Sequence, residues 1–286
     1  MDTELARTFL SVVAAGNFSQ ASSRLFITQS TVSARIATLE AQLGCRLFVR
    51  NKAGTSLTPA GHRFQAYAIT LVRTVERARQ DIGVVRGFRG SVTIGGRFGL
   101  WEDLLLACLP RIRQAVGDVA VRAEIGFEDD LMQGLVEART DIGVMYAPQH
   151  RPGMVVEQLL EEQLVYVTSS RENSSPADNG YVYVDWGPEF ANQHSAAFPE
   201  FDGAGVSANI GWLGLQHILA NGGSGYFPLR LVKSELIMGR LQRRPELPEF
   251  VLPAYLVHLS DVDPQTVGVV LQIIRDAAAE GGSVTD

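Results

Sequence analysis

Cysteine is scarce in this chain, where only Cys45 and Cys108 occur among 286 residues. Two cysteines form at most one disulfide, so the fold does not depend on a disulfide framework. We expect two inert thiols, with Cys45 packed at the start of a hairpin and Cys108 inside a helix. No run of about 18 apolar residues occurs, so no membrane span is expected. The acidic start, Met1–Glu4, lacks a signal-peptide pattern, and we expect a cytoplasmic protein.

Patterns typical of catalysis and metal binding are also missing. The five histidines are scattered, and none has metal-ligand spacing to a cysteine, so we expect no zinc site and no cofactor. No G-x-S-x-G elbow is present, and the stretch 222–225 lacks the Lys-Ser or Lys-Thr that completes a phosphate loop. The sequence therefore gives little support to an enzyme.

Charge is divided unevenly along the chain, although the net charge is only −6. Residues 1–88 hold 11 basic and 5 acidic residues, a net charge of +6. Residues 89–286 hold 14 basic and 26 acidic residues, a net charge of −12. A basic N-terminal segment joined to an acidic remainder is typical of a DNA-binding head that carries a separate body.

Residues 17–43 have the pattern of a helix-turn-helix, after a first helix over residues 4–15. Ser19 can cap a short helix that ends near Leu25, and a second helix begins near Gln29. The apolar residues of the second helix recur at helical spacing and are expected to face inward: Val32, Ile36, Leu39 and Leu43. Polar residues at its N-terminal end are expected to face DNA bases: Gln29, Ser30, Thr31, Ser33 and Arg35.

A basic hairpin is expected over residues 46–57, with its turn near residues 51–54. Arg46, Arg50 and Lys52 would contact phosphates, which positions a domain on DNA without reading the base sequence. The alternative is a solvated basic turn. The neighbouring helix-turn-helix favours the DNA contact.

A long helix begins at Thr58-Pro59, because threonine can cap a helix and proline suits its first position. Its apolar residues alternate at spacings of four and three, as in a heptad seam: Phe64, Ala68, Leu71, Val75, Ala78 and Ile82. A helix of roughly 28 residues spans about 42 Å, which is long for packing within one small domain. We expect the seam to join two copies of the chain and to set two heads at the spacing of two half-sites.

Strands and helices alternate through the remainder. The expected strands are 91–96, 119–127, 141–147, 163–170, 181–186, 225–228 and 255–260, and the expected helices are 100–116, 129–138, 211–221, 231–243 and 264–280. Such alternation predicts parallel sheets with helices on both faces. About 200 residues of it fit two linked α/β lobes, with ligands bound at the carboxyl ends of strands.

The first strand of this region is followed by a candidate effector site, formed by Arg97, Phe98, Gly99, Leu100 and Trp101. Backbone amides at the start of a helix can bind an anion, and arginine and aromatic residues would add charge and apolar walls. The alternative is a capped helix with aromatic residues in the core. Four residues at other strand ends are further candidates: Phe127, Tyr146, Asn209 and Phe227.

Several motifs of the first 61 residues resemble those of LysR-type transcriptional regulators, among them Thr28-Gln29-Ser30, Leu39-Glu40 and Leu57–Gly61. The resemblance spans the chain. It implies a winged helix-turn-helix head over residues 1–58, with Arg50 and Thr58 also near the DNA. It further implies the following regions: a dimerising linker helix over 59–88, and a two-lobed effector domain like a periplasmic binding protein over 89–286, with lobe I at about 89–163 and 261–286 and lobe II at about 164–260.

The resemblance also implies a function. A LysR-type regulator would bind an inverted-repeat operator as a dimer or tetramer and respond to a small molecule between its lobes. Its partners would be double-stranded DNA and a second copy of itself, with RNA polymerase as a further candidate. The alternative is a dimeric solute-binding module or enzyme that does not bind DNA.

Details of the sequence distinguish it within that family. Ala34 and Ala37 stand where relatives often have basic residues. Trp101-Glu102, the stretch 186–190 and His194 resemble the members described as repressors of the flagellar master operon. We infer no target operon from these residues.

Overall fold

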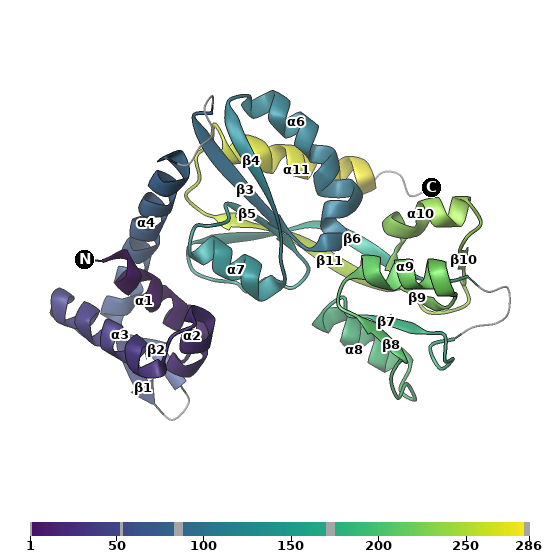
Figure 1. Cartoon of the computed structure of the whole chain (residues 1–286), viewed down its shortest axis with the longest axis horizontal. Helices are drawn as coiled ribbons and strands as arrows, with labels where there is room; N and C mark the ends of the chain where they lie inside the picture. The colour runs from purple at the N-terminus through teal and green to yellow at the C-terminus, as the bar shows by residue number, and fades with distance from the viewer. Residues whose placement is uncertain (1, 52–53, 83–87, 170–174, 283–286) are drawn as a thin grey trace. The chain divides into compact units, whose positions relative to one another are not determined.

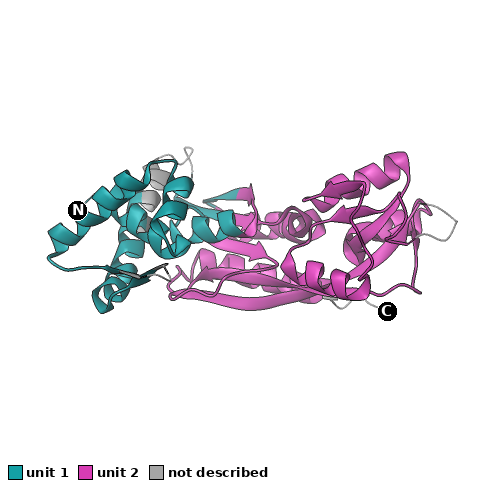
Figure 2. Ribbon diagram, turned by 90° about the horizontal axis from the view of Figure 1, so that it is seen from below, with its two compact units in different colours: residues 1–93, 118–122, 129–141 teal, residues 94–117, 123–128, 142–286 magenta. Residues whose placement is uncertain are grey.

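The computed structural model describes residues 2–51, 54–82, 88–169 and 175–282. The chain forms two compact units: residues 1–93, 118–122 and 129–141 make the first, and residues 94–117, 123–128 and 142–286 make the second (Figure 2). Among the described residues, no helix combines the length and the apolar character that a membrane span requires.

The N-terminal head contains three helices, a hairpin and the start of a long helix (Figure 1). In chain order these are α1 (Thr3–Ala15), α2 (Phe18–Leu25), α3 (Gln29–Leu43), β1 (Phe48–Asn51), β2 (Gly54–Leu57) and α4 (Pro59–Ile82). The strands pair antiparallel, with Phe48 opposite Leu57. The predicted helix-turn-helix and basic hairpin are therefore confirmed as local structure.

The ends of these helices correct three predictions made from the sequence. The cap of α2 is Asn17, whose side chain accepts from the amide of Gln20, and not Ser19. Leu43 was expected to face inward but is exposed, because it is the last residue of α3 and Gly44 ends the helix there in a left-handed conformation. Cys45 was expected to pack beside the hairpin and is exposed as well.

Four phenylalanines form the core of the head. The ring of Phe9 in α1 lies 5.1 Å from that of Phe48 and 5.0 Å from that of Phe64, measured between centroids. Phe18 completes the cluster, with its ring 5.8 Å from Phe48. The core thus joins α1, α2 and the hairpin to the first turns of α4, which fixes the hairpin beside the helix-turn-helix.

That core overturns part of the predicted dimer seam. Phe64 and Ala68 are buried within the head itself, so they are not free to contact a second copy. The physical reason is that α1 packs along the first turns of α4 and covers this face. Leu71 and Val75 are half-buried and Ala78 is exposed, while the side chain of Ile82 lies outside the described residues. Their role in a seam stays a prediction.

A mixed sheet of seven strands follows. It contains β3 (Gly90–Gly96), β4 (Val119–Ile125), β5 (Ile142–Met145), β6 (Met154–Thr168), β9 (Ser224–Pro228), β10 (Gln242–Arg243) and β11 (Phe250–Leu259). The order is β10-β6-β11-β5-β3-β4, and β9 also pairs with β6. The strands β3 and β5 pair in parallel, whereas β11 runs antiparallel to both β5 and β6.

The expectation of parallel sheets therefore holds for β3 with β5, but not for β11. The antiparallel part was not predicted because β6 is longer than expected: it begins at Met154 rather than at residue 163 and pairs along the whole of β11. The segment before Gln163 mixes charged and apolar residues without a clear period, so it does not read as a strand. The border predicted between the lobes, at residues 163 and 164, falls inside this strand.

Helices and a second, two-stranded sheet complete the fold. The helices are α6 (Leu106–Val116), α7 (Glu128–Val136), α8 (Pro188–Ala197), α9 (Gly211–Asn221), α10 (Leu229–Ile237) and α11 (Val267–Gly282), and the short strands are β7 (Val182–Val184) and β8 (Val206–Ala208). The strands β7 and β8 pair in parallel, so the expectation of parallel sheets holds for them as well. The sequence did not predict α8 or β8, and the helix expected over 231–243 ends at Ile237 and is followed by β10.

A buried histidine lies in an aromatic core beside these short strands. His194 of α8 shares a hydrogen bond of 2.9 Å with the hydroxyl of Tyr181. Its ring centroid lies 4.9 Å from that of Phe201 and 5.4 Å from that of Tyr183. Burial lowers the pKa of His194 below its ordinary value, so the folded protein disfavours the charged form of this imidazole.

Stability is accordingly expected to fall as the pH drops below about 6.5, the ordinary pKa of an unfolded histidine. Below this pH His194 binds a proton in the unfolded chain, whereas its burial opposes protonation in the folded protein. The difference of one bound proton lowers the free energy of unfolding by at most about 1.4 kcal/mol per pH unit. Calorimetry between pH 7.5 and 5.5 should show a weaker pH dependence for His194→Gln than for the unsubstituted protein. The exposed His150, changed to Gln, is the control. An unchanged slope in His194→Gln would contradict this prediction.

Candidate functional site

The N-terminal end of α3 presents polar side chains to solvent. Gln29 and Ser30 are exposed, and the buried residues Val32, Ile36 and Leu39 anchor the opposite face of the helix. Thr28, which the sequence analysis assigned only to the turn, is the cap of α3. Its hydroxyl oxygen accepts from the amide of Thr31 and lies 2.8 Å from the hydroxyl oxygens of Ser30 and Thr31. The cap therefore orients hydroxyl groups that we predicted to face DNA.

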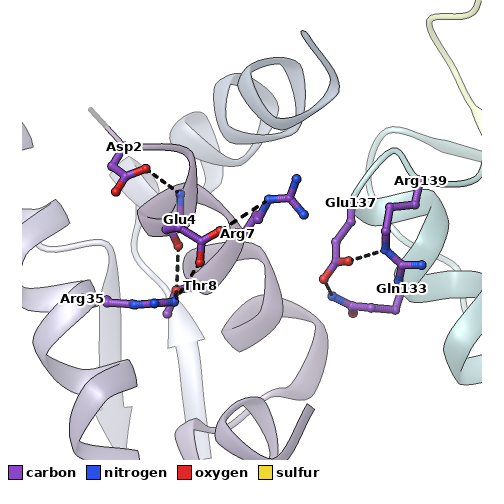
Figure 3. A network of polar contacts seen from close by, with 8 residues as sticks. All are labelled: Asp2, Glu4, Arg7, Thr8, Arg35, Gln133, Glu137 and Arg139. Atoms are coloured by element: carbon purple, nitrogen blue, oxygen red, sulfur yellow. Dashed lines mark hydrogen bonds and ion pairs between the residues drawn. The ribbon is translucent and has the colours of Figure 1, made fainter. Parts of the chain in front are cut away.

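Arg35 lies differently from the other predicted DNA-facing residues. Its guanidinium donates to the carboxylate of Glu4 and to the hydroxyl oxygen of Thr8, each at 3.2 Å (Figure 3). Both partners belong to α1, so this arginine ties the second helix of the motif to the first helix of the chain. A base contact by Arg35 stays a prediction, and it would require these bonds to open.

A groove of about 460 Å³ runs between α3 and the hairpin. Its lining comes from α2, α3 and the hairpin: Phe18, Ser33, Ile36, Ala37, Glu40, Arg46 and Phe48. The carboxylate of Glu40 accepts from the amide of Leu47 at 2.7 Å and so fixes the start of the hairpin. The side chain of Arg46 is 85% exposed beside the same carboxylate. The groove thus has a solvent-accessible cation at its rim, a charge suited to a phosphate.

The remaining predicted DNA contacts lie in and after the hairpin. The side chain of Arg50 and the whole of Lys52 lie outside the described residues. The hydroxyl of Thr58 donates to the carbonyl of Arg46 at 2.7 Å and accepts from the amide of Gly61 at 3.0 Å. Thr58 therefore caps α4, as predicted, and the same bonds hold the hairpin against that helix.

The second candidate site lies where β3 ends, and its helix is not continuous. The helix expected over 100–116 is divided into α5 (Phe98–Leu100), a π-helical turn (Trp101–Leu105) and α6. The break lies at Glu102, with ψ at 132°, and Asp103, with φ at 60°. Because α5 is only three residues long, its N-terminus lacks the dipole that the predicted anion site needs. The structure therefore removes the basis of that prediction.

Arg97 is buried beside this turn, and its charge is already compensated. Its guanidinium donates to the carboxylate of Glu128 at 3.2 Å and to the carbonyl of Asp185 at 3.4 Å. It also lies over the ring of Phe127, at 4.6 Å from the centroid. Of the predicted effector residues, Arg97 and Phe127 are thus brought together.

Aromatic side chains from several elements surround α5. The ring of Phe98 lies 6.2 Å from that of Trp212, which is 43% exposed at the start of α9. Trp101 is buried and donates from its indole nitrogen to the carbonyl of Glu124. Leu100 is fully buried in the core. The exposed member of the cluster, Trp212, was not among the residues that the sequence analysis singled out.

The other three candidates at strand ends differ in their exposure to solvent. Tyr146 is buried next to Gly99, at which a Cβ would lie 3.5 Å from the tyrosine hydroxyl, and Asn209 is exposed. Burial and the neighbouring Glu162 carboxylate raise the pKa of Tyr146 well above its ordinary value, so the hydroxyl stays protonated. Phe227 was expected to line the crevice, but it is completely buried among Gly214, Gly225 and Trp186. Its strand lies in the interior, so Phe227 supports the core instead.

Two charged residues that the sequence analysis missed join this cluster. Arg230, the second residue of α10, donates to the carboxylate of Glu162 in β6 at 2.5 Å. Burial, the largest influence, lowers the pKa of Arg230, but the charge and hydrogen bond of Glu162, together with Tyr146 and Asp103, raise the pKa above its ordinary value. In the sequence Arg230 stands among apolar residues, whereas Glu162 lies between Glu161 and Gln163, and nothing local relates the two.

Two domains of known protein families match this chain. The bacterial regulatory helix-turn-helix protein, lysR family, matches residues 3–62, and the LysR substrate binding domain matches residues 86–177. The HTH-type transcriptional regulators HdfR of Yersinia pestis (strain Pestoides F) and of Yersinia pseudotuberculosis serotype O:1b (strain IP 31758) are each 28% identical over 279 residues. The match covers 93% of this chain and 94% of each relative.

Solved structures share the fold over nearly the whole chain. The crystal structure of ArgP from Mycobacterium tuberculosis has a TM-score of 0.60 and 22% identity, and the match covers 98% of both chains. A full-length OxyR variant from Pseudomonas aeruginosa has a TM-score of 0.56 and 16% identity, covering 97% of this chain and 94% of that one. At these identities the likeness supports the fold alone.

A winged helix-turn-helix head joined to a mixed α/β region with its own buried polar cluster defines a DNA-binding regulator that carries a sensing domain. With both parts of the family matched in order, the chain belongs to the LysR family of transcriptional regulators. It is a DNA-binding transcriptional regulator with an effector-binding domain. The alternative of a solute-binding module or enzyme without DNA binding was wrong, because the matched helix-turn-helix family and the relatives are transcriptional regulators.

Proposed function

We propose that this regulator binds an inverted-repeat operator as a homodimer or homotetramer, with α3 of each head in a major groove. The observation that carries the proposal is the exposed polar end of α3, where Gln29 and Ser30 extend from a helix anchored by its buried face. A recognition helix reads base edges with side chains at this end. Glutamine can make paired hydrogen bonds to adenine.

The hairpin supports the same orientation. Arg46 lies at the rim of the groove between α3 and the hairpin and is free of burial, so a phosphate can approach it. Phosphate contacts of this kind set the register of a domain on the duplex. A protein with this fold, full-length CbnR, has been solved in complex with its target DNA. A regulator bound beside a promoter can also meet RNA polymerase, and we include that partner in the proposal.

Two copies are required because an inverted repeat has two half-sites. Leu71, Val75 and Ala78 of α4 are the members of the predicted seam that the head does not bury. We propose that they contribute to contacts between copies.

The test is Gln29→Ala, with Gln42→Ala as a matched control on the exposed surface of the same helix. In anisotropy titrations against DNA from its own promoter region, Gln29→Ala should weaken specific binding by roughly 10-fold or more and leave binding to random duplex unchanged. Loss of one bidentate base contact is worth about 1–3 kcal/mol. Gln42→Ala should bind like the unsubstituted protein. Equal weakening on both DNAs would contradict the base-reading role.

We further propose that a small molecule binds between the lobes, beside Phe98, Phe127, Asn209 and Trp212. The support is chemical: the exposed Phe127 lies against the buried Arg97 at the end of β3, Phe98 pairs with the exposed Trp212, and ligands of such folds bind at strand ends. A polar group of the ligand could bond the exposed amide of Asn209.

Tryptophan fluorescence tests this site. The chain has three tryptophans, and Trp101 and Trp186 are buried while Trp212 is half-exposed. A metabolite that binds here should change the emission of Trp212, and the change should disappear in Trp212→Phe. A ligand that alters emission equally in both proteins binds elsewhere and would count against the proposed site.

A further inference from the structure

Arg230 connects segments that lie far apart in the sequence. One terminal nitrogen donates to the Glu162 carboxylate and, at 2.8 Å, to the carbonyl of Gly99. The other donates to the carbonyl of Glu102 at 2.5 Å. The side chain is 24% exposed and that of Glu162 is 4% exposed. A single guanidinium thus bridges α10, β6 and the interrupted helix after β3.

The acceptors are arranged for this guanidinium by local backbone geometry. At Glu102 the extended ψ turns the carbonyl oxygen away from the helical direction, and Asp103 follows in a left-handed conformation that non-glycine residues rarely adopt. Strain of this kind persists only where surrounding contacts hold it. The hydrogen bond from Arg230 to the carbonyl of Glu102 is such a contact.

Every partner of Arg230 is an acceptor. Glu162 supplies the negative charge, and the hydroxyl of Tyr146 donates to that carboxylate at 3.4 Å and helps to fix it. Two carbonyls supply the other acceptors. A planar donor fork matches this set, whereas a compact ammonium can satisfy fewer of the acceptors at once.

We propose that Gly99, Glu102 and Glu162 form a guanidinium-binding site whose resident ligand is Arg230 of the same chain. The regulatory role of this site rests on the proposed binding of an effector. An effector with a guanidinium or primary ammonium group would compete with Arg230 for these acceptors and release the bridge between α10 and the turn after β3. The site therefore takes a cation, whereas the sequence pattern suggested an anion.

Chemical rescue tests the site in the full-length protein. Arg230→Ala should lower the melting temperature of the regulatory region by about 5 °C, because it removes the charged donor from a buried carboxylate and from two carbonyls. Methylguanidinium at about 10 mM should restore at least half of this loss in Arg230→Ala and shift the unsubstituted protein far less. Methylammonium should restore less, since it lacks the planar fork.

Arg240→Ala is the control, since the side chain of Arg240 is 55% exposed and forms an ion pair with Glu235 on the same part of the chain. It should show no rescue. Equal shifts in all three proteins, or no shift in Arg230→Ala, would overturn the assignment. If Arg230→Ala yields no folded protein, Arg230→Lys replaces it, and a melting temperature equal to that of the unsubstituted protein would overturn the need for a guanidinium. None of these measurements involves DNA or an effector, so failure of the proposed function is detected separately.

Discussion

Gly61→Ala should destabilise the DNA-binding head by about 3 kcal/mol and abolish specific DNA binding at ordinary temperatures. A Cβ at Gly61 would lie 2.3 Å from the carbonyl oxygen of Leu47 and 2.8 Å from the side chain of Leu57. The carbonyl cannot easily move, because it accepts from the amide of Thr58 at 2.9 Å. The added methyl therefore pushes α4 away from the hairpin that carries the basic residues.

The control for this change is Gly268→Ala in α11, where a Cβ would have only ordinary contacts at 3.7 Å. It should leave DNA binding intact, and its stability should be unchanged or slightly raised, because alanine favours a helix. Calorimetry and DNA titrations on both variants check the expectation. If Gly61→Ala has the same melting temperature as the unsubstituted protein, α4 and the hairpin can separate without cost, and the prediction is wrong.

The second large effect is expected at Glu162→Ala, which should reduce the free energy of unfolding of the regulatory region by about 2–4 kcal/mol. The carboxylate is almost completely buried, and its removal takes away the ion-pair partner of the Arg230 guanidinium. The hydroxyl of Tyr146 loses its acceptor at the same time. The expected loss is below that of a fully buried pair because water still reaches part of Arg230.

Glu161→Ala is the matched control, since the neighbouring residue of the same strand is exposed. It should change stability by less than about 0.5 kcal/mol. The double variant with Arg230→Ala should recover part of the loss, because removing both charges avoids an unpaired one. Chemical denaturation of the unsubstituted protein, Glu162→Ala, Arg230→Ala and the double variant measures the coupling between the two residues. Strictly additive losses of stability would contradict a direct interaction.

The head was largely predictable because its signals are local. Helical spacing identified α3 through Val32, Ile36 and Leu39, and Gly16 and Gly44 stopped their helices where expected. The cap of α2 was misassigned because Asn17 and Ser19 are both good caps within two residues. Spacing alone does not decide between such neighbours.

The apolar face of α4 shows what a local sequence pattern cannot predict. Heptad spacing establishes that one face of a helix is apolar, but it does not say which surface covers that face. Tertiary packing gives Phe64 and Ala68 to α1 and the hairpin, which leaves a shorter apolar stretch than predicted. Likewise, no local signal predicted that β6 would run unbroken from Met154, since its pairing partner β11 lies about 100 residues later.

The candidate effector site was found only in part. Arg97 and its aromatic neighbours follow a predictable strand, so the general position was available from the sequence. Its electrostatics were not, because Glu162 and Arg230 meet only through long-range folding. The break at Glu102 and Asp103, which turns a carbonyl toward Arg230, also has no sequence pattern that we recognised.

By itself the sequence determined the class of protein: periodicity, caps and motif spacing are short-range properties, and they specified a helix-turn-helix followed by a basic hairpin. It also assigned positive charge to the head and negative charge to the remainder. Only the tertiary structure decided which apolar faces are already covered and which charges are already paired. Burial and ion pairing depend on residues brought together from distant parts of the chain, and no local pattern encodes them.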